Sequence, residues 1–158
     1  MFAILSTVAV LFMICIVSYC RTVQTAKRTL CKSQMHSLDV ALCSYCFAPV
    51  SNYPASLAEL NPIDISPLVL LCPAATRIRS RIGKPGAVSE DFGKNLSEMD
   101  QFSDYIYVAG LSAASPPRMP LVICPPENHN GRGGNVLFTE HKVLWIGKPD
   151  IEKLIDWT

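Results

Sequence analysis

The chain carries little charge, and its two signs are almost balanced. Charged residues make up 17% of its 158 residues, with 14 Lys and Arg against 13 Asp and Glu. Nucleic-acid-binding domains usually have a clear basic excess, so this composition argues against a nucleic-acid partner. Hydrophobic residues make up 49% of the chain. That share argues against long intrinsically disordered stretches.

The chain also lacks the short motifs of common enzyme classes. It has no phosphate-binding glycine loop, no dinucleotide-binding fingerprint and no Gly-x-Ser-x-Gly nucleophile motif. None of its three histidines accompanies a nucleophile motif. We therefore expect that this protein is not an enzyme.

Glycine and proline are absent before Pro49, and charge is absent from residues 1–20. As a helix with a rise of about 1.5 Å per residue, such a run matches a bilayer core of roughly 30 Å. We interpret residues 1–20 as a transmembrane anchor. A cleaved signal peptide is the alternative, but it would have a basic start and a shorter apolar run.

A helical pattern continues beyond the anchor. Apolar side chains recur with spacings of four, three, four and three residues, at Cys31, Met35, Leu38, Leu42 and Tyr45. This spacing places them on one stripe of a helix, which we call the packing stripe. We expect residues 21–47 to be an amphipathic continuation of the helix that packs on a head domain through this stripe. Two helices with a bend near residues 21–25 are the alternative.

Residues 48–158 are expected to form a small α+β head. Short apolar runs rich in aromatic and β-branched residues predict four strands, at residues 104–109, 121–124, 135–138 and 142–146. A short closing helix is expected at residues 151–157. Three residues separate the last two strands, which predicts an antiparallel hairpin. The predicted fold is therefore α+β, with a long N-terminal helix packed on a small antiparallel sheet.

Two of the seven cysteines stand in the same local pattern. Cys72 and Cys124 each end a short apolar run and precede a proline. In an oxidising compartment they could form a disulfide across a loop of about 50 residues, which would add about 3 to 4 kcal/mol of stability. The odd total leaves at least one thiol unpaired or available to another chain.

Another pair, Cys43 and Cys46, has the Cys-x-x-Cys spacing of redox and metal sites. It lies at the end of the predicted helix, where the helix dipole does not stabilise a thiolate. Zinc bound there would need two further ligands, and His36, Cys72 and Cys124 have no motif spacing to it. The pair alone therefore does not predict a site. We interpret Cys31 as a small apolar member of the packing stripe.

Two histidines flank the predicted hairpin. Together with two neighbouring glutamates they form a candidate divalent-cation site, consisting of Glu127, His129, Glu140 and His141. Carboxylate oxygens and imidazole nitrogens are common metal ligands, and a divalent cation such as calcium could bind to such a set. The alternative is that this segment, rich in Asn and Gly, serves only as a turn. No other cofactor is predicted.

The order of several short motifs resembles a known protein family. These motifs are Leu30-Cys31-Lys32-Ser33-Gln34-Met35-His36-Ser37-Leu38, Ala41-Leu42, Tyr45, Tyr53-Pro54, Leu57 with Leu60, Leu71-Cys72-Pro73, Asp104-Tyr105-Ile106-Tyr107 and residues 127–140. The pattern is similar to pilin-like proteins of the type IV pilin and type II secretion pseudopilin superfamily. Within it, the pattern is closest to a group common in planctomycete and verrucomicrobial genomes.

This resemblance implies a single-pass protein of the bacterial inner membrane with a periplasmic head. Such a protein would be a structural subunit that associates with other pilin-like subunits or with secretion-machinery proteins. The alternative function is a membrane-tethered, extracytoplasmic metal- or ligand-binding module.

The chain departs from the family pattern in three places. Met1 stands where the family's cleavage motif has glycine, and Ser6 stands where it has glutamate. Later, Glu140-His141 replaces the usual Asp-Gly.

The orientation implied by the family also conflicts with the charge pattern. The positive residues that follow the anchor are Arg21, Lys27, Arg28 and Lys32. By the positive-inside rule they would place the head in the cytoplasm. We follow the family topology, because these charges lie on an amphipathic helix and the count is sensitive to any leader before Met1.

Overall fold

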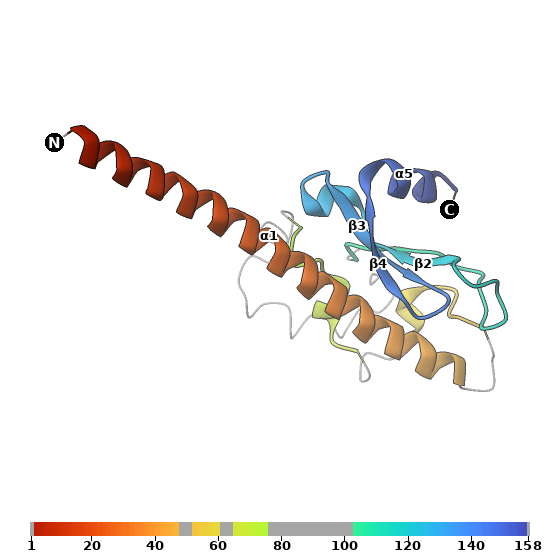
Figure 1. Ribbon diagram of the computed structural model, residues 1–158. Coiled ribbons are helices and arrows are strands. Elements are labelled where there is room, and N and C mark those ends of the chain that lie inside the picture. Colours follow the sequence, from red (N-terminus) through yellow and green to blue (C-terminus); the bar gives the residue numbers. More distant parts are fainter. Residues whose placement is uncertain (1, 48–51, 61–64, 76–102, 158) are drawn as a thin grey trace.

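The computed structural model describes residues 2–47, 52–60, 65–75 and 103–157. Within these ranges the chain begins with one long helix, α1 (Phe2–Phe47), and continues through short 3-10 turns into a small sheet and a final helix (Figure 1). The later elements are η1 (Leu57–Glu59), η2 (Pro67–Leu70), β1 (Ile106–Tyr107), β2 (Pro120–Ile123), η4 (Pro126–His129), β3 (Gly133–Phe138), β4 (Val143–Gly147) and α5 (Lys148–Trp157). The fold is α+β, as the sequence predicts.

The four described strands form one antiparallel sheet in the order β1-β2-β3-β4. All six residues of the central strand β3 are buried. In the hairpin of β3 and β4, Val136 is paired with Leu144. His141 closes the hairpin in the left-handed region, with φ of 62°, and its N–H donates to the carbonyl of Phe138. The predicted hairpin is therefore present, with β4 ending at Gly147 rather than at Ile146.

Each face of the sheet is covered by a helix. Side chains alternate between the two faces along each strand, so neighbouring residues of one strand pack against different helices. Val122 and Leu137 belong to the apolar cluster that includes the packing stripe of α1. Ile123 and Val136 belong to a second cluster, around Ile151 of α5. The sheet thus lies between α1 and α5 (Figure 1).

The second half of α1 packs on the head through the packing stripe. Its members Cys31, Met35, Leu38 and Leu42 are fully buried, and Tyr45 is half-buried. Burying one such aliphatic side chain contributes roughly 1.5 to 3 kcal/mol. Tyr45 also donates a hydrogen bond to Oε2 of Glu59, at 2.8 Å, which ties the end of α1 to η1.

The first half of α1 extends away from the head (Figure 1). Residues 10–20 are all exposed. This helix is long and apolar enough to cross a membrane: its most apolar window has a mean hydropathy of 1.8, and none of that window is buried. The helix runs unbroken from Phe2 to Phe47, so two separate helices are not observed.

Candidate metal centre at the junction of helix and sheet

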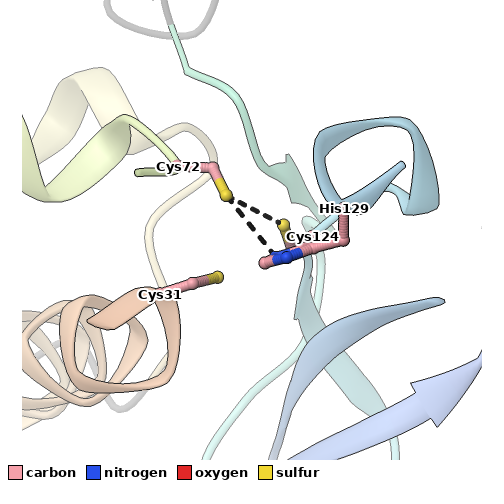
Figure 2. Close-up of side chains that lie close together, drawn as sticks. All are labelled: Cys31, Cys72, Cys124 and His129. Carbon is pink, nitrogen blue, oxygen red and sulfur yellow. Dashed lines mark hydrogen bonds between the residues drawn. The ribbon is translucent and has the colours of Figure 1, made fainter. Parts of the chain in front are cut away.

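Four buried side chains meet where α1 faces the sheet. They are Cys31, Cys72, Cys124 and His129, and their ligand atoms all lie within 4.8 Å of one another. We call this group the Cys3His cluster. Figure 2 shows the three sulfur atoms and the imidazole pointing toward a common centre. The Sγ of Cys72 lies 3.7 Å from the Sγ of Cys124 and 3.6 Å from Nε2 of His129.

Each member of the cluster comes from a different part of the fold. Cys31 is the first fully buried member of the packing stripe on α1. Cys72 follows η2, which is held to α1 by a hydrogen bond from Nε2 of Gln34 to the carbonyl of Leu68, at 3.1 Å. The backbone N–H of Cys72 donates to Oδ2 of Asp104, at 2.9 Å. The position of Cys72 is therefore set by α1, which binds the preceding turn η2, and by Asp104, which comes later in the sequence.

The other two members lie at the end of β2 and on the turn η4 that follows it. Cys124 directly follows β2, and its N–H donates to the carbonyl of Asn135 on β3, at 2.9 Å. His129 ends η4, where Asn130 adopts the left-handed conformation that terminates the turn. A side chain at Gly134 would collide with the carbonyl of Cys124. Glycine at this position therefore allows the close approach of β3 that positions Cys124.

Neighbouring polar groups surround the cluster. Nδ2 of Asn128 lies 3.6 Å from the Sγ of Cys124 and donates to the carbonyl of Asp104 at 2.9 Å. The hydroxyl of Tyr105 lies 3.8 Å from the Sγ of Cys31. Two sulfur atoms thus have an N–H or O–H donor close to them.

An aromatic ring and a cation flank the imidazole. The His129 ring meets Trp145 edge-on, with the ring centroids 5.1 Å apart. The guanidinium of Arg28 lies 4.0 Å from the centroid of Trp145, on which it stacks. The ring of His129 therefore packs against Trp145, and the positive charge of Arg28 lies on the same indole.

Crowding three buried thiols shifts their pKa values in opposite directions. Hydrogen bonds with Cys124 and Cys72 lower the pKa of Cys31 well below its usual value, whereas the other two thiols are harder to ionise. Hydrogen bonds with Cys31 and Cys72, together with burial, raise the pKa of Cys124 well above its usual value. For Cys72, the contact with Cys124 lowers the pKa, but the contact with Cys31 and burial outweigh it and raise the pKa to about 12. A cation at the centre would reverse this balance, because a coordinating thiol is deprotonated outright.

A second, smaller group lies at the other end of the sheet. Nδ1 of His141 lies 2.9 Å from Oδ1 of Asp39 and 3.3 Å from the Sγ of Cys43. Asp39 is buried on α1, whereas His141 is exposed at the hairpin. This group joins helix and hairpin through a hydrogen bond, and it has one ligand fewer than the Cys3His cluster.

The four residues of the candidate cation site do not come together. His129 belongs to the Cys3His cluster and His141 to the group with Asp39. Strand β3 separates them, and six residues at about 3.3 Å each span roughly 20 Å. Glu127 is exposed, and Glu140 pairs with Lys142 at 3.1 Å. The expected cation site is therefore not formed. His129 lies with Cys31, Cys72 and Cys124, and His141 lies with Asp39 and Cys43.

Cys72 and Cys124 are adjacent, as the sequence suggested, but both are free thiols. The sequence did not predict that Cys31 and His129 lie beside them, although His129 was already a candidate ligand. The repeated Cys-Pro pattern was a usable signal for the pair. Nothing in the sequence linked the pair to a cysteine of the packing stripe or to a histidine in a turn, because the four ligands have no short spacing.

Comparison of the chain with family models, with curated proteins and with solved structures finds no match. Its class is therefore defined by fold and site alone. It is an α+β protein with one helix long and apolar enough to cross a membrane, and with a buried Cys3His cluster among its described residues.

Proposed function

We propose that the chain is a membrane-anchored, pilin-like structural subunit rather than an enzyme. It would cross the bacterial inner membrane once, carry its head in the periplasm, and assemble with other pilin-like subunits or with proteins of a secretion machinery. The observation that carries this proposal is the continuity of α1, whose first half is bare and whose second half is packed into the head.

The bare half of α1 supports a membrane environment. Large apolar side chains such as Leu11, Phe12 and Met13 are each more than 60% exposed. Soluble monomers rarely expose apolar patches beyond a few hundred Å². Lipid, or the helices of neighbouring subunits, would cover this surface without leaving polar backbone groups unpaired, because an α-helix bonds its own backbone.

The unbroken helix also supports a role in assembly. Its 46 residues span about 70 Å, of which a bilayer core takes up roughly 30 Å. The helix continues without a break from this span to Cys31, where its burial against the head begins, so no flexible linker separates anchor and head. Packing of neighbouring helices in the membrane would therefore fix how neighbouring heads are arranged. A tethered binding module needs no such rigid connection.

The proposal is tested by photo-cross-linking in the native membrane. A benzophenone amino acid replaces Phe12, which is 65% exposed on the bare half of α1. We expect protein adducts that contain a second copy of the chain or another pilin-like or secretion-machinery protein. The matched control carries the same probe at Trp157, which is 56% exposed on α5, and it should not give those adducts. Adducts with lipid alone at residue 12 would contradict the proposal.

A further inference from the structure

We propose that Cys31, Cys72, Cys124 and His129 bind one zinc ion, and that this ion fastens the head to the helix. The inference is independent of the proposed assembly, since it rests only on contacts within one chain. Three sulfur donors and one imidazole form a ligand set typical of structural zinc sites.

The distances agree with tetrahedral zinc. With Zn–S bonds of about 2.3 Å, tetrahedral geometry places two sulfur ligands about 3.8 Å apart. The Sγ atoms of Cys72 and Cys124 lie 3.7 Å apart. With a Zn–N bond of about 2.0 to 2.1 Å, a sulfur and a nitrogen ligand should lie about 3.6 Å apart. The Sγ of Cys72 and Nε2 of His129 lie 3.6 Å apart.

The donor chemistry selects the metal. Calcium and magnesium take oxygen ligands, whereas thiolates favour zinc and other soft cations. All four ligand residues are buried, at 0% exposure for the cysteines and 4% for His129. A site with four protein ligands has no open position for a substrate or a reactive water, so the zinc would be structural rather than catalytic.

The surroundings of the cluster suit a bound metal. Three thiolates and one zinc ion carry a net charge of −1, and N–H or O–H donors near sulfur offset such charge. Asn128 offers such a donor to Cys124. The Tyr105 hydroxyl lies 3.8 Å from the Sγ of Cys31 and 3.2 Å from Oε1 of Gln34, so its one proton is shared between the two. Arg28, which stacks on Trp145 beside His129, adds a positive charge. Such outer contacts orient metal ligands and tune their affinity.

A Cys72–Cys124 disulfide is the competing interpretation. It would bring the two sulfur atoms from 3.7 Å to about 2.05 Å. It would also leave Cys31 and His129 aimed at the pair without a function. Zinc accounts for all four side chains, whereas the disulfide accounts for two.

Zinc at this place would couple helix and head energetically. Its ligands come from α1, from the segment after η2, from the end of β2 and from η4. Since such a site forms only when these segments are together, the binding free energy of the metal adds to the free energy of folding. Removing the ion should therefore loosen α1 from the head before the sheet itself unfolds.

The first test uses the full chain, purified in detergent without chelator. We expect about one zinc per chain by elemental analysis. Exchange with cobalt chloride should give the intense visible bands of tetrahedral cobalt with thiolate ligands. Titration with a mercurial thiol reagent should release the zinc in step with three thiols. Metal-free protein with a Cys72–Cys124 disulfide, or cobalt spectra typical of octahedral oxygen ligands, would overturn the proposal.

Variants assign the ligands. Cys31→Ser should lose most of the zinc, and Asn128→Ala, which keeps all four ligands, should lower zinc affinity by about 10- to 100-fold. The matched control is Cys43→Ser, which alters a partly buried cysteine of the same helix outside the cluster and should keep the zinc. Full zinc content in Cys31→Ser, or its loss in Cys43→Ser, would contradict the assignment. Because the cobalt spectrum is recorded on the unaltered chain, the test does not depend on whether Cys31→Ser folds.

Discussion

His141 and Asp39 join the tip of the β3–β4 hairpin to α1: Nδ1 of the histidine lies 2.9 Å from Oδ1 of the aspartate. Cys31, eight residues earlier on the same helix, belongs to the Cys3His cluster. At about 1.5 Å per residue these two positions are about 12 Å apart along α1. The helix therefore contacts the head at these two points, with Met35 and Leu38 of the packing stripe buried between them.

The contact of Asp39 with His141 should contribute measurably to stability. Asp39→Ala removes an acceptor that is 8% exposed and leaves His141 with the Sγ of Cys43 as its remaining contact on α1. We expect a loss of about 1 to 3 kcal/mol in the free energy of unfolding, measured by denaturant titration in detergent. Asp150→Ala is the matched control, because Asp150 pairs with Lys153 at 3.4 Å and both side chains are exposed. It should change stability by less than about 0.5 kcal/mol, and equal losses in the two variants would contradict the assigned role.

Packing of α1 on the head is tested by a pair of substitutions on that helix. Leu38 is fully buried, whereas Val40, two residues later, is 66% exposed. Leu38→Asp should cost about 3 kcal/mol or more, since it buries an unpaired carboxylate. It should also make the helix–head junction sensitive to protease. Val40→Asp should leave melting and proteolysis unchanged, and identical melting of both variants would rule out the packing.

The close approach of β3 to Cys124 makes Gly134 intolerant of a side chain. A Cβ at this position would collide with the Cys124 carbonyl and would crowd Cδ1 of Ile151. Gly134→Ala should therefore cost about 1 to 3 kcal/mol in thermal or denaturant unfolding, as overpacking does in well-packed cores. Gly147→Ala is the control, because the nearest atom to its Cβ would be Cδ of Pro149 at an ordinary 3.9 Å. A harmless Gly134→Ala would contradict the described register of β3 on β2.

Stability should fall at alkaline pH through the buried Tyr53 and the half-buried Tyr107. Burial, with smaller contributions from neighbouring charges, raises the pKa of Tyr107, and burial likewise raises that of Tyr53 to about 12. In the unfolded chain a tyrosine ionises near pH 10. The neutral form favoured by the fold is therefore fully stabilising below about pH 10, and its contribution is lost as the pH rises toward the folded pKa.

Tyr107→Phe isolates one of these contributions. The hydroxyl of Tyr107 donates to the carbonyl of Pro54 at 2.7 Å, so at neutral pH the variant should lose about 1 kcal/mol. Above about pH 10 its stability should fall less steeply than that of the parent, as judged by denaturant titrations between pH 7 and 11. Parallel pH profiles for the two proteins would show that Tyr107 is not the group that titrates.

Features with a local signal could be predicted from the sequence. A helix repeats every 3.6 residues, so the spacing of Cys31, Met35, Leu38 and Leu42 identified the face that is buried. Each predicted strand overlaps an observed one, but the first was predicted too long. It spans only Ile106–Tyr107, because Asp104 bonds instead to the segment after η2. The ends of this strand are therefore set by contacts with residues far away in the sequence, which a local pattern cannot reveal.

The Cys3His cluster could not be predicted, because its ligands come from four segments between residues 31 and 129. Cys31 has the spacing of an apolar stripe residue and is indeed buried there, so periodicity alone did not distinguish a ligand from a core residue. His129 and His141 looked like partners because both flank the hairpin. The length of β3 separates them, and only the packing of α1 on the sheet decides which groups each histidine meets.

The proposed arrangement, a membrane anchor that carries an extracytoplasmic head, is best tested by topology in living cells. One fusion places a reporter that is active only outside the cytoplasm after Thr158, and a parallel fusion places a reporter that is active only inside. We expect activity of the outside reporter alone, in membrane fractions. Activity of the inside reporter alone would contradict the pilin-like role and would support the orientation given by the positive charges after the anchor.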